Sequence, residues 1–237
     1  LTATPERHDG LDVLKYFDYH IAAEIRLPDA INRKLLSPFQ YFGISDSVDL
    51  SVLKWSNGGY DKSQLNNIFT GNHVRANLVL QKMHEILLDI DQCRALCFCV
   101  SQNHAEFMND FFNAHGVKSA VLTAQSSVQE RNTVQGRLIS KEINVICVVD
   151  LYNEGVDIKE IDTVLFLRPT ESLTVFLQQL GRGLRLHEDK ECLTVLDFVG
   201  NAHRNFNFEY RFRAMLGPSG ENVIDEMEHG FPHLPAG

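Results

Sequence analysis

The second part of the chain alternates between short apolar runs and amphipathic stretches with helical spacing. The pattern predicts strands at 95–100, 118–123, 144–149, 163–167 and 192–199, and helices at 103–115, 127–139 and 173–184. The run at 144–149 is β-branched and continuously apolar, which is typical of a strand covered on both faces. Strands that alternate with helices predict an α/β fold, doubly wound around a mostly parallel sheet with helices on both faces.

The first part of the chain has weaker periodicity. Residues 38–44 predict an edge or first strand, and Asn72 is a candidate cap for a helix that runs to about Leu88. The polar segment 45–71 between them predicts a turn at 55–59, in which Trp55 acts as a packing anchor rather than a platform for bases. We divide the chain into residues 1–35, a main domain at 36–200 and a helical extension at 201–237.

Aromatic and basic residues alternate in that extension. Phe208, Tyr210 and Phe212 are interleaved with Arg211 and Arg213. Such a pattern is compatible with a nucleic-acid surface. Its spacing also suits a helix that packs back on the sheet, and we favour packing.

Composition excludes several classes of protein. A chain of 237 residues with 44% hydrophobic content can bury a substantial core. The net charge of −9 argues against a generic coating protein for nucleic acid, because affinity without sequence preference comes from Lys and Arg. No apolar segment approaches the roughly 18 to 20 residues that span a bilayer, and no leader pattern is present. We therefore expect a soluble, cytoplasmic protein without a membrane partner.

The five cysteines lie mostly inside apolar runs, which predicts reduced core residues. Cys97 and Cys99 are two positions apart on a predicted strand, and no second pair of ligands stands at a spacing typical of zinc. We therefore predict no metal site.

The most informative motif is the octapeptide at 178–185, Gln-Gln-Leu-Gly-Arg-Gly-Leu-Arg, at the end of a predicted helix. Each glycine inside a helix costs about 1 kcal/mol relative to alanine. Arg182 and Arg185 are three positions apart, so in a helix they project from one face. A pair of guanidinium groups on a rigid element suits a phosphoryl group in transfer, whose transition state spreads negative charge over several oxygens. A solvated helix end with ordinary surface arginines is the alternative.

Three loops follow predicted strands, where open α/β sheets bind their ligands. In Asn153-Glu154-Gly155-Val156-Asp157, Gly155 permits close approach of the backbone, and Asp157 offers a carboxylate to a ribose hydroxyl or an arginine. Ser101, Gln102 and Asn103 open one helix, and Thr123 precedes another whose first turn carries Arg131, so both loops are natural seats for phosphate. A plain turn and simple helix caps are the alternatives.

Taken in order, the strand, the Asn-Glu-Gly-Val-Asp loop, the next strand and the Gln-x-x-Gly-Arg-x-x-Arg helix resemble the second motor domain of superfamily-2 helicases. The opening Thr2-Ala3-Thr4 resembles the motif that closes the first motor domain of that family. The continuation Asp9-Gly10-Leu11-Asp12 is similar to the branch with type III restriction motor subunits and repair-type DNA translocases. Val149-Asp150 and Gln178-Gln179 depart from the usual RNA-helicase pattern, which favours the DNA-translocating branch.

The resemblance implies a RecA-like domain that works with ATP and Mg²⁺ on DNA. The chain contains no Gly-Lys dipeptide, so a phosphate loop and a magnesium-binding Asp-Glu pair are expected on an N-terminal motor domain of the same protein. Residues 1–35 would then be the tail of that domain and a linker, and the fragment alone is expected to be inactive.

By the same resemblance each candidate residue has an expected role. Arg182 and Arg185 are arginine fingers, and Thr2 and Thr4 couple the two domains. Gly155, Asp157 and Gln178 contact ATP, and Ser101, Gln102, Asn103, Thr123 and Arg131 grip the backbone of the nucleic acid. An RNA helicase of the same superfamily and a degenerate, non-catalytic docking module remain alternatives.

Overall fold

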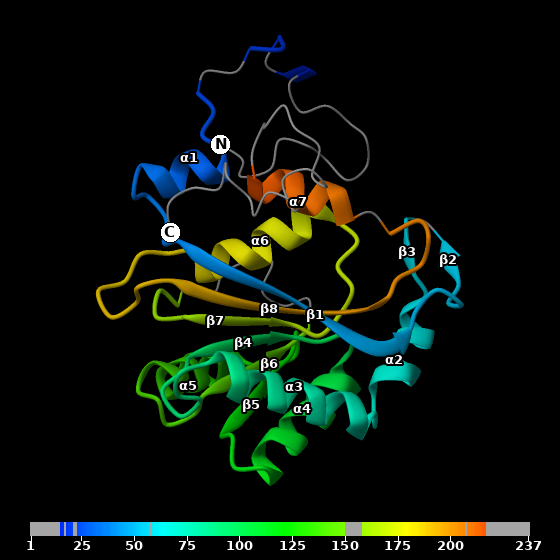
Figure 1. Ribbon diagram of the computed structural model, residues 1–237. Helices are drawn as coiled ribbons and strands as arrows, with labels where there is room; N and C mark the ends of the chain where they lie inside the picture. Colours follow the sequence, from blue (N-terminus) through cyan, green and yellow to red (C-terminus); the bar gives the residue numbers. More distant parts are fainter. Residues whose placement is uncertain are drawn as a thin grey trace.

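The computed structural model describes residues 15–16, 18–20, 23–56, 58–149, 158–206 and 208–216. Their centre is a six-stranded sheet in the order β1-β8-β7-β4-β6-β5, in which every pairing is parallel (Figure 1). The strands are β1 (Phe39–Asp49), β4 (Ala95–Phe98), β5 (Ser119–Leu122), β6 (Val145–Val148), β7 (Thr163–Phe166) and β8 (Leu193–Asn201). Because all strands run the same way, their carboxyl ends meet at one edge of the sheet and their amino ends at the other.

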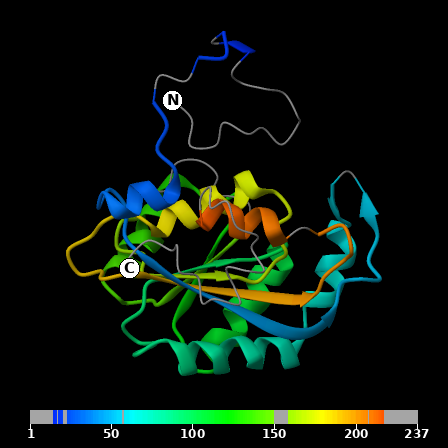
Figure 2. The same ribbon diagram turned by 45° about the horizontal axis from the view of Figure 1, so that its top comes forward.

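Helices cover both faces of the sheet, as the turned view also shows (Figure 2). One layer contains α1 (Leu27–Asn32), α5 (Val128–Ile139), α6 (Leu173–Gly183) and α7 (Phe208–Leu216). The opposite layer contains α3 (His73–Ile86) and α4 (Gln102–Ala114), while α2 (Lys62–Phe69) packs beside α4 near the end of β1. The predicted doubly wound α/β fold is therefore confirmed. No helix in the described ranges is both long and apolar enough to span a membrane.

The central strands owe their apolar character to burial on both faces. In β4, Leu96 and Phe98 belong to the core under α5 and α6, whereas Cys97 belongs to the core under α3 and α4. All four residues of β4, of β6 and of β7 are buried. A strand of this kind shows no polar alternation, so its continuous apolar run is the expected signal. Between 95 and 199, the observed elements begin and end within two residues of the predicted limits.

The segment 45–71 is more ordered than its polar sequence predicts, and here the prediction is incomplete. β1 continues to Asp49, and the hairpin strands β2 (Trp55–Ser56) and β3 (Gly59–Tyr60) precede α2. The sequence pattern does not indicate this extension of β1, because a charged residue, Asp46, occupies one of its buried positions. The Arg75 Nε atom donates to Asp46 Oδ2 at 2.8 Å, so the buried carboxylate has a charged partner that lies 29 positions away.

Candidate functional site

The candidate arginine helix, α6, is amphipathic and begins at the carboxyl edge of the sheet. Ser172 caps it by accepting a hydrogen bond from Val175 N at 3.3 Å. Phe176 and Leu180 are fully buried on its core side. The helix therefore crosses the sheet and ends near the amino edge.

Arg182 lies in the last turn of α6, and Arg185 follows the cap residue Leu184. Both arginines and Gln178 are partly exposed. The sequence pattern predicts that this helix ends at Leu184, next to Arg185. In the structure α6 ends one residue earlier, at Gly183. The direction of the Arg185 side chain is consequently set by the loop and its contacts rather than by helical spacing alone.

The two glycines of the motif have different surroundings. A Cβ atom at Gly183 would lie 2.8 Å from Leu193 Cδ2 on β8, closer than carbon atoms pack. Gly183 is thus required for close packing of α6 on the sheet. At Gly181, no atom of another element in the described ranges lies within 4 Å of where a Cβ would be. Packing in the described part of the chain therefore explains the glycine at position 183 but not the glycine at position 181.

The C-terminal end of α6 is held by donors from distant segments. Ser37 N donates to Leu184 O at 2.7 Å, and Ser37 Oγ donates to Arg185 O at 3.0 Å. Lys190 Nζ donates to Gly183 O at 2.9 Å. Ser37 is only 1% exposed. Together with the bond from Leu184 N to Gly181 O, these donors satisfy four of the carbonyls at and just beyond the helix end, those of Gly181, Gly183, Leu184 and Arg185.

Lys190 also binds the segment that precedes β7. Its Nζ atom donates to Ile161 O at 3.0 Å and to Lys159 O at 3.1 Å, so three carbonyls surround one ammonium group. Burial lowers the pKa of Lys190 to about 8, and the nearby carboxylates of Asp162 and Glu160 oppose that shift. The sequence gives no sign that Lys190 and Ser37 contact the helix end, because neither belongs to a recognisable local motif.

The candidate residues Gly155 and Asp157 lie outside the described residues, as do Thr2 and Thr4. The flanks of the loop that contains Gly155 are described and lie at opposite edges of the sheet. Val148 is at the carboxyl end of β6, whereas Ile158 and Ile161 precede the amino end of β7 and pack in the same core as α6.

The candidate nucleic-acid residues after β4 lie at the carboxyl edge. Ser101 caps α4 by accepting a hydrogen bond from His104 N at 3.1 Å, and its hydroxyl donates to Asn66 Oδ1 of α2. Gln102 Nε2 donates to Glu106 Oε1 at 2.9 Å, while the side chain of Asn103 is exposed. Ser101 therefore has a capping role in the structure, and it also ties α4 to α2.

The candidate residues after β5 lie at the same edge. Thr123 Oγ1 accepts a hydrogen bond from Gln125 N at 3.3 Å, and Arg131 Nη2 donates to Ala124 O at 3.0 Å. In the sheet, β6 lies between β4 and β5. The two loops are thus separated by one strand, and the loop with Gly155 leaves from that intervening strand. The structure brings the predicted nucleic-acid residues to one edge and the arginine pair toward the other.

Residues 79–187 match the family model of the helicase conserved C-terminal domain. A crystal structure of a DEAD box protein from the hyperthermophile Methanococcus jannaschii superposes with a TM-score of 0.52, covering 86% of this chain and 46% of that one at 13% identity. Residues 79–187 therefore carry a helicase conserved C-terminal domain, and the likeness to the solved structure shows a shared fold.

Two relatives are longer than the chain. The chain is 27% identical over 202 residues to a Saccharomyces cerevisiae protein named as an ATP-dependent helicase, IRC3, covering 84% of this chain and 29% of the relative. It is 33% identical over 206 residues to a Schizosaccharomyces pombe protein named as a mitochondrial ATP-dependent helicase, irc3, covering 86% of this chain and 33% of the relative. The chain spans about a third of the length of these relatives.

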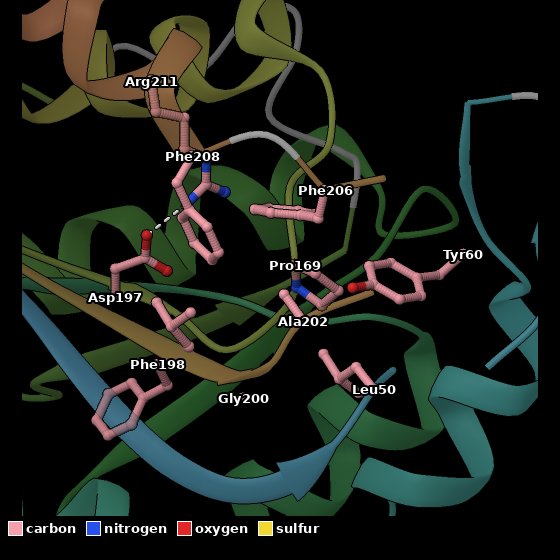
Figure 3. Close-up of a pocket in the computed structure, with 11 residues that line it drawn as sticks. Leu50, Tyr60, Pro169, Asp197, Phe198, Gly200, Ala202, Phe206, Phe208 and Arg211 are labelled. Carbon is pink, nitrogen blue, oxygen red and sulfur yellow. Dashed lines mark hydrogen bonds and ion pairs between the residues drawn. The ribbon is translucent and has the colours of Figure 1, made fainter. Parts of the chain in front are cut away.

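A pocket lies at the carboxyl end of β8, where Tyr60, Phe206 and Phe208 line it together with Pro169 (Figure 3). Trp55, beside this pocket, stacks on His203 at 5.2 Å between ring centroids and meets Tyr60 edge-on at 4.8 Å. The packing role expected for Trp55 agrees with these contacts.

An ion pair between Asp197 and Arg211 forms the base of the pocket, with Arg211 Nη1 2.5 Å from Asp197 Oδ2 (Figure 3). Arg211 Nη2 donates to Thr170 O at 2.8 Å, and the guanidinium lies 4.6 Å from the ring centroid of Phe176 on α6. Tyr41 Oη donates to the same carboxylate. Burial raises the pKa of Asp197, and Arg211 opposes the shift. These contacts of Arg211 hold α7 against the rest of the fold, in agreement with the packing role that the sequence pattern favours for this helix.

The structure of the helicase domain adds a third cysteine to the pair at 97 and 99. The parallel pairing of β4 with β6 sets Cys147 opposite Cys97, and the sulfur atoms of all three residues lie within 4.8 Å of one another. Sequence spacing does not reveal this neighbour. All three residues are fully buried in the core under α3 and α4, and burial raises the pKa of the Cys97 thiol.

Proposed function

We propose that this helicase C-terminal domain forms one wall of an ATPase site between two motor domains, in a protein that moves along or unwinds DNA. The observation that carries the proposal is the end of α6. There Arg182 and Arg185 are partly exposed next to Gly181, while donors from distant segments hold the backbone. A transferring phosphoryl group needs positive charge at a fixed position, and a fixed backbone at this motif supports that role.

The described residues fit the phosphate end of a nucleotide. Guanidinium groups bind phosphate oxygens in a bidentate manner. Gln178, one turn before Arg182 on the same helix, is partly exposed and would contact the nucleotide as well. Gly155 and Asp157 are proposed for its ribose side. We assign no magnesium ligand to this chain, so Mg²⁺ and most phosphate contacts belong to the N-terminal motor domain.

In this mechanism the two domains close around ATP. Arg182 and Arg185 then stabilise the charge that develops on the γ-phosphate, a contribution of about 10³ to 10⁵ in rate in related phosphoryl-transfer enzymes. Thr2 and Thr4 would transmit closure between the domains. Each cycle of closure and release shifts the grip on the nucleic acid.

The carboxyl edge of the sheet is proposed as the nucleic-acid side. The loops after β4 and β5 lead into the N-terminal ends of α4 and α5, where free backbone N–H groups favour phosphate. Ser101, Gln102, Asn103, Thr123 and Arg131 lie on or beside these loops. Because the net charge is −9, affinity would come from a few directed contacts rather than from a basic surface.

The decisive experiment replaces Arg182 with alanine in the complete protein. We expect nucleic-acid-stimulated ATP hydrolysis to fall by about 10³-fold or more, with ATP binding within a few-fold of the unmodified protein. The control is Arg137→Ala on α5, an exposed arginine that pairs with Glu142 at 2.7 Å and should leave turnover unchanged. Normal hydrolysis in the Arg182 variant would reject the proposal.

Two other functions are separated by simple measurements on the complete protein. Stimulation of the ATPase by RNA and not by DNA would identify the RNA-directed alternative. The departures from the RNA-helicase pattern at Val149-Asp150 and Gln178-Gln179 favour DNA. Absence of ATP hydrolysis with either nucleic acid, in protein that binds its partners, would identify the non-catalytic docking module.

A further inference from the structure

The end of the arginine helix is connected to three other segments at the amino edge of the sheet. Ser37 precedes β1, Lys190 precedes β8, and the carbonyls of Lys159 and Ile161 precede β7. None of these residues is part of the Gln-x-x-Gly-Arg-x-x-Arg motif. Ser37 donates to the carbonyls of Leu184 and Arg185 just beyond α6, and Lys190 Nζ donates to the carbonyls of Gly183, Lys159 and Ile161.

The Lys190 ammonium is placed where it can serve two elements at once. It has three N–H donors, and three backbone carbonyls lie at 2.9 to 3.1 Å from Nζ. One carbonyl belongs to Gly183, the residue next to Arg182, and two belong to the segment directly after the loop with Gly155 and Asp157. Lys190 is 9% exposed, so removal of the ammonium would leave these carbonyls with little access to water.

Apolar packing alone is another way in which the position of this helix end could be fixed. Gly183 does pack closely on Leu193, but a contact between apolar groups tolerates sliding of the helix along its axis. Hydrogen bonds to carbonyls 183, 184 and 185 do not, because their energy falls steeply with distance and angle. The polar contacts therefore set the axial position of the helix end.

We infer that Lys190 and Ser37 form a clamp of positioning residues, which fixes the backbone at Arg182 and Arg185 relative to the segment 159–161 that precedes β7. The inference rests on the proposed function, since it assigns the clamp to the same ATPase site. The clamp acts through the backbone from which the arginines extend and not by contact with the nucleotide.

The test measures kcat and KM for ATP in the complete protein. Lys190→Met should lower kcat by about 30-fold or more while KM changes less than about three-fold, because a displacement of about 1 Å costs on the order of 10² in rate. Ser37→Ala removes one bond in a side chain that alanine replaces without strain, and should lower kcat by about three- to ten-fold. This second variant keeps the test decisive if the first does not fold.

Asn144→Leu is the matched control. Asn144 is 2% exposed at the amino end of β6, and its Nδ2 donates to the carbonyl of Asp91 at 2.7 Å, away from α6. The variant removes the same kind of bond, so it should lose stability but keep the kcat of each folded molecule. Normal kcat in Ser37→Ala and Lys190→Met, or an equal loss in Asn144→Leu, overturns the clamp. If Arg182→Ala remains inactive in that case, the proposed function survives; if Arg182→Ala hydrolyses ATP normally, both fall.

Discussion

The two edges of the sheet hold their candidate residues in different ways. At the carboxyl edge, Ser101, Ser127 and Ser172 each accept a hydrogen bond from a backbone N–H three residues further on, at the start of its own helix. At the amino edge, Ser37 reaches the end of α6 in one bond across 148 positions, and Lys190 reaches Gly183 from the segment before β8, seven positions away. The caps fix where a helix begins, whereas donors from outside the helix fix where its end lies in the fold. The backbone beside Arg182 and Arg185 is therefore held by contacts from outside its own helix.

The largest expected difference between the two edges is a loss of protein stability at low pH, caused by a residue at the carboxyl edge. His104 is fully buried behind Ser101, and its Nδ1 accepts from Val100 N at 3.3 Å. Burial lowers its pKa to about 4, with Cys99 and Arg75 nearby. Because the unfolded chain binds a proton near pH 6.5 and the folded chain only near 4, stability should fall as pH decreases through that window, by on the order of 3 kcal/mol.

Urea unfolding between pH 4 and 7 measures this dependence. His104→Leu, which cannot titrate, should have a flatter profile than the unmodified protein over the same range. Lys190 itself should contribute little, since its pKa of about 8 keeps it charged over most of this range. An equally steep profile in the leucine variant would show that another group causes the loss.

The next largest difference is between the stability changes caused by replacing the two glycines of the arginine motif with alanine. Gly183→Ala should destabilise the protein by about 1 to 3 kcal/mol, because the added methyl overlaps Leu193. At Gly181 no atom of another element in the described ranges lies within 4 Å of an added Cβ, so Gly181→Ala should stabilise the helix by up to about 1 kcal/mol. In the complete protein we expect Gly181→Ala to lower ATP turnover, because the proposed nucleotide site lies beside this position. Denaturation curves and turnover, measured on both variants, distinguish packing from function.

The smallest effect concerns the local caps. Ser101→Ala should cost about 1 kcal/mol, because α4 loses its cap and the tie to Asn66. Ser127→Ala, on an exposed cap with no such tie, should cost less. Thermal or urea unfolding gives the difference. Equal losses would mean that the bond between Ser101 and Asn66 contributes nothing to stability.

Sequence reasoning succeeds here where the signal is local. The continuous apolar runs of β4, β6 and β7 and the caps at Ser101 and Ser127 lie within a few residues of what they determine. For this reason the sheet, its helices and the arginine motif could be placed from the sequence alone. The roles of the individual candidate residues rest on the family resemblance and stay predictions.

The features that escaped prediction depend on partners far away in the chain. The extension of β1 contains a buried Asp46 that is acceptable only because Arg75 pairs with it. Cys147 joins Cys97 through strand pairing, and Ser37 reaches Arg185 across 148 positions of the chain because β1 and β8 are neighbours in the sheet. No periodicity or spacing encodes such contacts, since each follows from the topology after the sheet has formed.

The position of β1 has a consequence for how the protein is made. Among the described residues β1 pairs with β8 alone, and Phe39 is opposite Leu193, 154 residues later. During synthesis at about 5 to 20 residues per second, the first strand must wait on the order of ten seconds or more for its neighbour. Throughout that time its hydrogen-bonding edge and the apolar side chains of its sheet face are without their final cover. Closure of the sheet at β1 is therefore expected to be slow, and until β8 arrives the uncovered strand is prone to aggregation.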